Sequence, residues 1–330
     1  MALSSRDVRA QGLSAFAIMP EQFPSPTAPL RLGTRGSPLA LAQAEMTLAA
    51  LSLAHGLPRE ALEIVVVTTS GDRIQDRALA ELGGKALWTK ELDRALLAGE
   101  IDCAVHSMKD VETIRPESIH IAAMLPRAAV EDRLIGAPSI EALKQGALIG
   151  TASPRRAAQL RALRPDLRTT LLRGNVARRL ASVEAGEIDA TLLAAAGLNR
   201  LGMEEVGATV PAEVMLPAVA QGAVGIECRT DDERMRRLLA AISDAPTQTC
   251  VFAERALLLA LGGSCHSPIG ALARLAGAGV HLRGQILLED GSEQVSGEIM
   301  LPTGDTAGAA ALAAQLLDGA SPALRSLFTP

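Results

Sequence analysis

The chain has 330 residues, a formal net charge of −5 and 48% hydrophobic residues, so it is long enough to bury the cores of two or three domains. Only 2% of the residues are aromatic and tyrosine is absent, which argues against single-stranded nucleic-acid binding on aromatic stacking platforms. The acidic balance argues against a general nucleic-acid footprint as well.

The N-terminal residues and the cysteines bear on the compartment. Residues 1–28 are rich in Ser, Pro and Ala, and their short apolar stretch lacks a convincing cleavage site, so we expect a disordered extension rather than a signal peptide. No apolar run of the sequence reaches the length of a membrane span. The cysteines form no CxxC motif and have no zinc-ligand spacing, which indicates free thiols in a reducing, cytoplasmic compartment and no metal site. They are Cys103, Cys228, Cys250 and Cys265.

Residues 29–126 alternate short apolar runs with helical patterns, as α/β domains do. Ser37 and Pro38 predict the start of a helix that runs to His55, because Gly56 can close it in the left-handed conformation. A second helix is predicted at 89–98. We expect strands at 30–33, 62–69, 101–105 and 119–124.

The same alternation resumes after residue 126. A linker rich in Pro and Gly follows it, and the run from Val224 to Arg229 is interpreted as one more strand, which can return to the first sheet. The predicted strands in between are at 147–150, 167–172 and 190–194, and the helices at 154–163 and 176–185.

From about Thr247 the pattern predicts an α+β module. It begins with one long helix at 249–261, continues with strands near Ile269, at 280–288 and at 294–301, and closes with a helix at 307–317. We therefore expect three domains after the extension. Their residues are 29–126 with 218–243, then 127–217, and then 244–330.

Eight arginines fall between Arg155 and Arg179, and a single acidic residue interrupts them. Guanidinium groups bind carboxylate or phosphate through paired hydrogen bonds. Ser153 and Pro154 predict a helix N-terminus, so Arg155 and Arg156 stand where the helix dipole disfavours a cation. An anion bound above this helix end would explain them. The alternative is a solvated arginine face.

Asp110 follows a strand of buried type, at the edge where α/β proteins place their sites. Its carboxylate could move protons or accept a hydrogen bond from a ligand. Spacing alone favours the simpler interpretation, in which Asp110 closes an Asx turn or caps a helix.

Two further segments contain candidate site residues. Gly83-Gly84-Lys85 fails the phosphate-loop pattern and is interpreted as a flexible loop that presents Lys85. Cys265 lies in a glycine-flanked loop after a helix end. A lone cysteine is more often an inert packing residue than a nucleophile, although a protonated His266 beside it would favour the thiolate.

Taken together, eight ordered motifs resemble those of the porphobilinogen deaminase family, whose members are also called hydroxymethylbilane synthases. The resemblance covers about residues 30–317, which makes a chance match very unlikely. The motifs are Thr34-Arg-Gly-Ser-Pro-Leu-Ala-Leu41, Gly83-Gly-Lys85, Ala104-Val-His-Ser-Met-Lys-Asp-Val111, Gly150-Thr-Ala-Ser-Pro-Arg-Arg156, Leu172-Arg-Gly-Asn-Val176, Ala196-Gly-Leu-Asn-Arg-Leu201, Leu216-Pro-Ala-Val-Ala-Gln-Gly-Ala-Val-Gly-Ile-Glu227 and the loop of Cys265.

The resemblance implies two α/β lobes like those of periplasmic binding proteins, plus a small C-terminal α+β domain that carries a cofactor cysteine. It also implies a transferase of tetrapyrrole biosynthesis. A covalent dipyrromethane, held through a thioether, would prime the head-to-tail condensation of four porphobilinogen molecules, with loss of ammonia, to hydroxymethylbilane. Porphobilinogen would be the partner, with no nucleic acid, membrane or obligate protein partner. The sequence leaves the oligomeric state open.

By motif position, the resemblance also assigns residues. Asp110 matches the catalytic carboxylate and Cys265 the attachment point of the cofactor. The acetate and propionate groups of pyrroles would explain the arginines, and we expect Arg155 and Arg156 to contact them rather than protein acids, which are sparse in that segment. Matches to cofactor-binding residues are Lys85, Lys109, Thr151, Ser153, Arg155 and Arg156, and matches to substrate-binding residues are Arg35, Ser37, Arg173, Arg179 and Arg200.

The chain departs from the family pattern at six positions, of which the one before Cys265 puts the geometry of that loop in doubt. None removes a residue that the chemistry needs. Glu81, Ala86, Ala152, Pro154, Ala220 and Ser264 replace the common Lys, Gly, Ser, Leu, Gly and Gly.

Two other functions fit part of the pattern. A binding module with two lobes around an acidic ligand would explain the arginines but would need neither Cys265 nor Asp110. Another pyrrole or amino-group enzyme that forms no covalent adduct is the second. The intact mass of the protein separates both from the first hypothesis, because only a covalent dipyrromethane adds mass.

Overall fold

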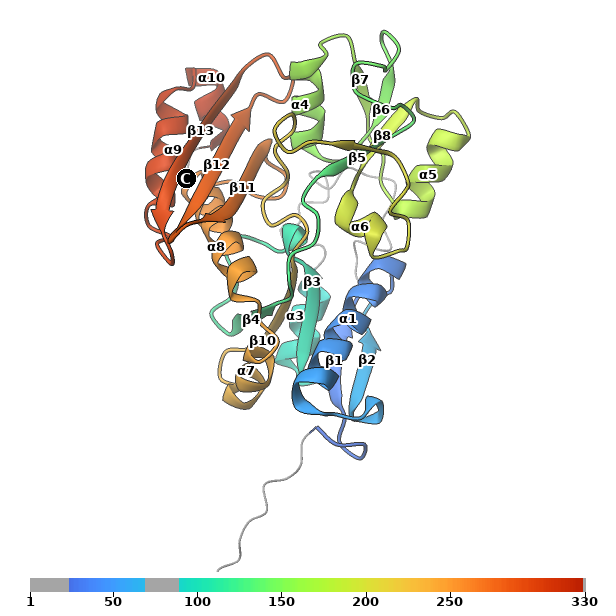
Figure 1. Cartoon of the computed structure of the whole chain (residues 1–330), viewed down its shortest axis with the longest axis vertical. Coiled ribbons are helices and arrows are strands. Elements are labelled where there is room, and N and C mark those ends of the chain that lie inside the picture. The colour runs from blue at the N-terminus through green and yellow to red at the C-terminus, as the bar shows by residue number, and fades with distance from the viewer. Residues whose placement is uncertain (1–23, 69–88, 329–330) are drawn as a thin grey trace, which may run out of the picture.

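The computed structural model describes residues 24–68 and 89–328, and within these ranges the chain forms three sheets (Figure 1). The predicted site residue Lys85 lies outside them, as do Glu81 and Ala86. Ser25 and Ala28, which fall in the expected disordered extension, form a turn closed by two backbone hydrogen bonds. No helix within the described ranges is long and apolar enough to span a membrane.

The first sheet has the strand order β2-β1-β3-β10-β4. Successive residues of β3 serve opposite faces, as strand geometry requires: Cys103 and Val105 pack with α1 and α7, whereas Ala104 packs with α3. This sheet with its helices is called lobe 1 below. Its elements are β1 (Leu30–Thr34), α1 (Pro38–His55), β2 (Leu62–Val66), α3 (Lys90–Leu97), β3 (Cys103–Ser107), β4 (Ile119–Met124), β10 (Val224–Arg229) and α7 (Glu233–Ala240).

The second sheet has the order β7-β6-β8-β5-β9 and, with its helices, forms lobe 2. Helix α4 contributes Leu160 to the core on one face, and α5 and α6 cover another core around Leu198. The elements are β5 (Asp132–Ile135), β6 (Leu148–Gly150), α4 (Pro154–Leu163), β7 (Arg168–Thr170), α5 (Val176–Glu184), β8 (Ala190–Ala194), α6 (Ala195–Asn199) and β9 (Ala208–Val210).

The two lobes share one topology. In each, three parallel strands are followed by one antiparallel strand, β10 in lobe 1 and β5 in lobe 2, and then by a fourth strand parallel to the first three. Two segments connect the lobes, residues 125–131 and residues 211–223, and are called the crossover segments below. Because the chain crosses twice, β10 returns to the first sheet, as the sequence allowed.

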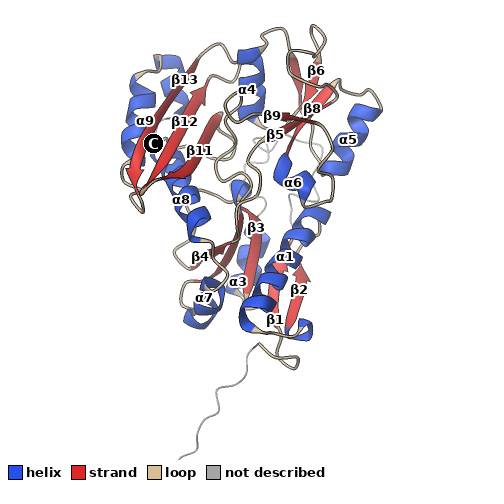
Figure 2. Cartoon of the chain, in the orientation of Figure 1, coloured by secondary structure: helices blue, strands red, loops and turns tan. Residues whose placement is uncertain are grey.

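The third sheet, β11-β12-β13, is antiparallel and packs on α8 and α9 (Figure 2). The fold is therefore the expected one, with two α/β lobes and a small C-terminal α+β unit. Helix α8 begins earlier than predicted, because Asp244 caps it and Pro246 occupies its first turn. The elements are α8 (Ala245–Ala260), β11 (Ile269–Ala276), β12 (Gly279–Leu287), β13 (Gln294–Pro302), α9 (Ala309–Asp318) and α10 (Pro322–Arg325).

Candidate functional site

A short 3-10 turn, Met108–Asp110, follows strand β3 and presents two charged side chains. Met108 is 1% exposed and lies against Gly225, where a Cβ atom would come within 2.0 Å of the Met108 sulfur. This packing fixes the turn and leaves Lys109 and Asp110 half-buried. The carboxylate of Asp110 accepts no hydrogen bond from residues 24–68 or 89–328, so the interpretation as a helix cap is not supported.

Three of the predicted residues line one small pocket, of about 60 Å³, at the carboxyl ends of β1 and β3. They are Arg35, Ser37 and Asp110. Ser37 accepts a hydrogen bond from Ala40 N at 3.3 Å and so caps α1, which is the local reason for its place. The loop after a strand and the N-terminus of the next helix thus meet at the edge of the sheet, as in other α/β sites.

A network of ion pairs, in which each charged side chain has a partner of opposite charge, lies beneath this turn in lobe 1. Arg115 donates to both oxygens of Glu227, at 2.8 and 2.9 Å, and also pairs with Glu112 and Asp93. His106 lies 3.1 Å from the Glu227 carboxylate, which is fully buried. Burial by itself would raise the pKa of Glu227, but the charges of His106 and Arg115 hold it at about 2.

Lys109 of this turn lies near cations of lobe 2. Burial lowers the pKa of Lys109, Asp110 opposes that effect, and the charges of Arg156 and Arg179 add to it. Burial and then Arg156 lower the pKa of Arg179 to about 10, with a further contribution from Arg173. Neither Lys109 nor Arg179 pairs with a carboxylate of the described residues. A bound polycarboxylate would relieve this repulsion between like charges.

Cys265 is the one exposed thiol among the four cysteines, all of which are described and free. Helix α8 ends at Ala260, and Gly262 with a φ of 62° starts the loop that carries Cys265. Ser264, a departure from the family pattern, accepts a hydrogen bond from His266 N and so closes the loop as a turn. The other three thiols are at most 7% exposed, so Cys250, which lies near the start of α8, is not available for contact with a ligand.

The loop of Cys265 reaches between the lobes. Partial burial and then the charges of Asp110 and Glu112 raise the pKa of the thiol. Burial and then Arg173 lower the pKa of His266. The sulfur therefore lies near the carboxylate of lobe 1 and its neighbour near an arginine of lobe 2. The lowered pKa of His266 disfavours its protonated form, so it works against the suggestion that a protonated His266 favours the thiolate.

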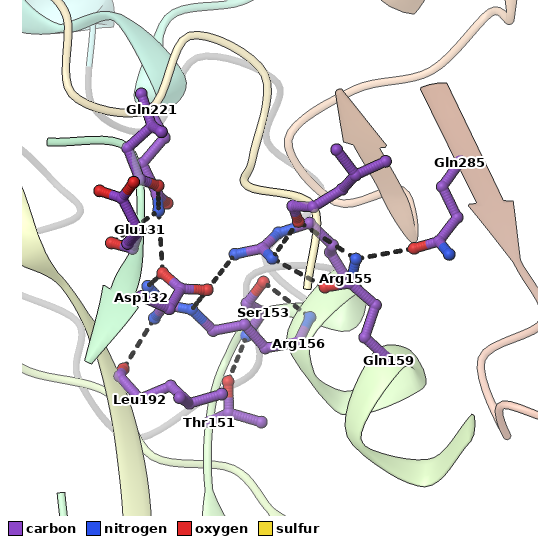
Figure 3. A network of polar contacts seen from close by, with 12 residues as sticks. Glu131, Asp132, Thr151, Ser153, Arg155, Arg156, Gln159, Leu192, Gln221 and Gln285 are labelled. Atoms are coloured by element: carbon purple, nitrogen blue, oxygen red, sulfur yellow. Dashed lines mark hydrogen bonds and ion pairs between the residues drawn. The ribbon is translucent and has the colours of Figure 1, made fainter. Parts of the chain in front are cut away.

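The expectation for Arg155 and Arg156 was wrong in one respect. Both pair with Asp132, at 2.8 and 2.7 Å, and are 3% and 7% exposed (Figure 3). The anion that balances the helix end of α4 is thus a protein carboxylate from outside the arginine segment. Burial would raise the pKa of Asp132, but the two guanidinium groups hold it far below its usual range. Contact of the arginines with a cofactor stays a prediction.

Thr151 and Ser153 shape the turn that leads into α4. Ser153 N donates to the Thr151 hydroxyl at 3.1 Å, and the Ser153 hydroxyl caps the helix at Arg156 N. Pro154 occupies the first turn that suits proline, so this departure from the family pattern fits the helix. Binding of a cofactor by the two hydroxyls stays a prediction.

The remaining arginines divide into two groups. Arg200 donates to the carbonyl of Gly222 in a crossover segment at 2.6 Å, and burial lowers the pKa of Arg200. The interpretation as an ordinary arginine surface holds for four members of the segment, which bond to nearby oxygens of lobe 2 and of the β12–β13 loop. These four are Arg161, Arg164, Arg168 and Arg178.

Sequence reasoning missed several residues of the site. Asp132 had no motif of its own, because its partners lie more than 20 residues away along the chain. Gln221 lies in a motif that was recognised, but no role followed from it; its amide donates to Asp132 at 2.9 Å. Gln43 and Ser107 bond at 2.8 Å and line the pocket of Asp110. For Asp132 and Gln221, the sequence signal is a polar residue at a buried strand start or in a glycine-rich linker.

Comparison with known proteins gives matches over nearly the whole chain. Residues 30–237 match the family profile of the porphobilinogen deaminase dipyromethane cofactor binding domain, and residues 248–318 match the porphobilinogen deaminase C-terminal domain. The chain is 58% identical to porphobilinogen deaminase of Sphingopyxis alaskensis, over 93% of this chain and 99% of that protein. It is 53% identical to that of Paracoccus denitrificans, over 92% and 97% of the two chains.

The similar solved structures are more distant. A periplasmic VFT2 domain of BvgS from Bordetella pertussis is 15% identical, with a TM-score of 0.39 over 64% of this chain and 86% of that one. A periplasmic substrate-binding protein of an ABC transporter from Coxiella burnetii is 17% identical, with a TM-score of 0.41 over 64% and 91%. At these scores the two structures carry no argument about the chain.

Proposed function

This chain belongs to the porphobilinogen deaminase family, and from that premise we propose which of its residues hold the cofactor, bind the substrate and move protons. The protein is a transferase of tetrapyrrole biosynthesis, a hydroxymethylbilane synthase that condenses four porphobilinogen molecules head to tail with loss of ammonia. Its cofactor is a covalently attached dipyrromethane.

The observation that carries the assignment of residues is the meeting of the exposed thiol of Cys265 with Asp110, Lys109 and Arg179, three charged groups for which no salt bridge to another described residue is found. Cys265 is accessible and close enough to Asp110 for the carboxylate to affect its pKa. Lys109 and Arg179 have lowered pKa values that bound carboxylates would restore. A cofactor that carries acetate and propionate groups and needs one thiol fits this set, and it supplies the covalent primer to which pyrroles are added.

We assign cofactor binding to the residues nearest the loop and to the start of α4. Cys265 forms the thioether, and Lys109 and Arg156 neutralise side-chain carboxylates of the cofactor pyrroles. Arg155, Thr151 and Ser153 act in the same region, and Lys85, which lies outside the described residues, stays a member of the set by motif position. The guanidinium fork of Arg156 suits a carboxylate better than an ammonium group does.

We assign substrate binding to the pocket at the edge of lobe 1 and to the facing arginines of lobe 2. Arg35 and Ser37 line the pocket together with Asp110, and Arg173, Arg179 and Arg200 bind the carboxylates of the incoming pyrrole. Asp110 is the catalytic group. Its carboxylate, which accepts no hydrogen bond from the described residues, accepts one from the pyrrole N–H, takes up and returns the proton that each condensation moves, and stabilises positive charge on the ring.

Mass spectrometry tests this function on the purified protein. The intact mass, measured under denaturing conditions, should exceed the sequence mass by one dipyrromethane, and peptide mapping should place the addition on the peptide of Cys265. The same protein should convert porphobilinogen to hydroxymethylbilane with release of ammonia. A protein that carries no addition and consumes no porphobilinogen would instead support the non-covalent binding module.

The organisation of the protein forms part of the proposal. We propose domains at 29–126 with 218–243, at 127–217 and at 244–330, a division supported by the three sheets. We propose that the enzyme acts in the cytoplasm on a small molecule, without nucleic acid, membrane or an obligate protein partner. The four free cysteines are in keeping with a reducing compartment.

A further inference from the structure

Two buried carboxylates hold the crossover segments at opposite ends. Glu254 of α8 is fully buried and accepts hydrogen bonds from Arg127 Nη1 at 2.7 Å and from Ala220 N at 2.6 Å. Each of these donors belongs to a different crossover segment. Glu254 also accepts from Ala273 N of β11 at 2.8 Å. This carboxylate therefore joins both segments to the C-terminal domain.

Asp132 holds the crossover segments at the end toward lobe 2, as Glu254 does at the end toward the C-terminal domain. It is the first residue of β5, directly after the first crossover segment, and is 2% exposed. It accepts from Gln221 of the second crossover segment at 2.9 Å and from Arg155 and Arg156 of α4. The amide of Gln221 also donates to the carbonyl of Val130 at 2.6 Å. Asp132 therefore joins both segments to the helix that begins the arginine segment.

The network continues from Arg155 toward the C-terminal domain (Figure 3). Arg155 Nη1 donates to the carbonyl of Leu216 in the second crossover segment at 2.6 Å and to Gln159 at 2.8 Å. Gln159 in turn donates to Gln285 of β12 at 2.7 Å. The side chain of Arg155 is thus directed to the crossover segments and to the third sheet.

The neighbouring Arg156 connects the same carboxylate to the candidate cofactor site. Arg156 lies in the first turn of α4, which begins just after the carboxyl end of β6, the sheet edge at which α/β proteins bind ligands. Its charge also lowers the pKa values of Lys109 and Arg179. Within the described residues, three of its N–H groups donate to Asp132 and to the carbonyl of Leu192. A guanidinium group has five, so two donors remain for another acceptor.

From this arrangement we propose that Asp132 is a positioning residue that holds the Arg156 fork toward the cofactor and links cofactor loading to the order of the two crossover segments. The inference rests on the proposed function, since it takes the cofactor carboxylates as the second acceptor of Arg156. Binding of the cofactor restricts the position of Arg156, and through it the position of Asp132. Asp132 in turn restricts Gln221 and Arg155, which hold the crossover segments. Linkage requires the reverse as well, so that loosened crossover segments weaken loading.

Hydrogen exchange on the full-length protein tests this link without any change to the network. The loaded wild type is compared with Cys265→Ser, whose lack of the cofactor is first verified by intact mass. We expect amides of residues 127–132 and 216–223 to exchange about 5-fold or more slowly in the loaded protein, while β12 and β13 change little. Equal exchange in both proteins would overturn the inference alone. A Cys265→Ser protein that still carries the cofactor would overturn the proposed function instead.

Variants of Asp132 test the positioning role. Asp132→Asn should load covalent cofactor about 10-fold or more slowly, because a misplaced fork binds carboxylate poorly. Asp132→Glu, which keeps the charge, should recover part of the loading, measured as the added mass against time with porphobilinogen. Asp166→Asn is the matched control, since Asp166 pairs with Arg164 away from the crossover segments, and it should load as the wild type does. Loading at the wild-type rate in Asp132→Asn contradicts the role.

A milder variant covers the case in which Asp132→Asn does not fold. Gln221→Leu removes the hydrogen bond to Asp132 but leaves both ion pairs with the arginines. We expect faster exchange in the crossover segments and slower loading of this variant, by a smaller factor than for Asp132→Asn. If Gln221→Leu matches the wild type in both measurements, the two segments are not linked to the arginines through Asp132.

Discussion

Asp110 of lobe 1 and Asp132 of lobe 2 lie near the same group of cations but differ in their partners. Asp132 is buried and accepts hydrogen bonds from Arg155, Arg156 and Gln221, whereas the half-buried Asp110 accepts none from the described residues. A carboxylate with all its partners supplied by the fold has no free acceptor for a ligand. Asp110, to which the described residues donate no hydrogen bond, can accept one from a ligand. This difference in partners supports a positioning role for Asp132 and a catalytic role for Asp110.

The thiol offers the most severe test of this contrast. Cys265→Ser should fold and carry no dipyrromethane, and it should make no hydroxymethylbilane, because a hydroxyl does not replace the thioether. Cys250→Ser should keep both, since Cys250 is 7% exposed and packs in the core under α8. Intact mass and product formation measure the two properties. Peptide mapping that placed the cofactor on Cys250 would contradict the assignment.

Replacement of Asp110 by Asn should lower the reaction rate more than the stability of the protein. Asp110→Asn is nearly isosteric and breaks no hydrogen bond with the described residues, so we expect little change in melting temperature and a kcat lower by about 10²–10⁴-fold. Asp102→Asn, at the other end of β3, is the control. Asp102 binds Arg31 through three hydrogen bonds, so this variant should lose stability and keep kcat. The opposite pattern would exchange the roles of the two residues.

Low pH should reduce the stability that buried, fully paired carboxylates contribute. Glu227 has its pKa lowered from 4.5 to about 2, so its contribution is fully present above about pH 4.5 and is lost as the pH falls toward 2. The contribution is about 3 kcal/mol. Glu227→Gln should therefore flatten the decline of stability in this range, measured by urea unfolding. Glu233→Gln, in an exposed pair with Arg237, should leave the decline unchanged. A Glu227→Gln curve parallel to the wild type contradicts the prediction.

Two adjacent arginines extend the comparison to the cations. Arg178 forms an exposed pair with Glu187, whereas Arg179 pairs with no carboxylate of the described residues and has its pKa lowered to about 10. Arg179→Ala should raise KM for porphobilinogen or slow cofactor loading by an amount equal to about 1.5–3 kcal/mol. Arg178→Ala should cost under about 1 kcal/mol and leave KM unchanged. Equal effects in the two variants would mean that Arg179 binds no ligand.

The smallest expected effect concerns the backbone of a crossover segment. Ala220 adopts a φ of 60°, the left-handed conformation that glycine takes without strain. Ala220→Gly relieves the strain but loses a buried methyl group and adds freedom to the unfolded chain, so the net change should stay within about 1 kcal/mol. Ala157→Gly, inside α4, should destabilise by about 1 kcal/mol. Urea midpoints compare them, and a loss above 2 kcal/mol at Ala220, about twice the expected limit, would contradict this account.

Local signals predicted much of the fold. Ser37 and Gly56 marked both ends of α1, and Ser153 with Pro154 marked the start of α4. Such signals act within one turn of the residue that carries them, so the sequence is enough to find them. Asp244 and Pro246 are equally local and announce α8 in the same way. The late start predicted for α8 was an error of interpretation and not a limit of the sequence.

The site was harder to predict because its interactions are distant along the chain. The roles of Asp110 and Cys265 came from motifs and not from periodicity. The partner of Arg155 and Arg156 could not be found from the arginine segment, since Asp132 precedes it by more than 20 residues. The scarcity of acidic residues within the arginine segment gives no information about Asp132, which begins a strand directly after a crossover segment. Only the pairing of β5 with β8 and β9 brings that carboxylate to α4.

The return of β10 to the first sheet has a consequence for the order in which the protein folds as it leaves the ribosome. Lobe 2 takes all its described strands from residues 132–210, so its sheet is complete before β10 is synthesised. Lobe 1 cannot join β3 to β4 until residues 224–229 emerge and insert between them. The later half of the nascent chain must therefore complete the earlier half. Because long-range pairing is slow, we expect lobe 2 to fold first and lobe 1 to close around its last strand.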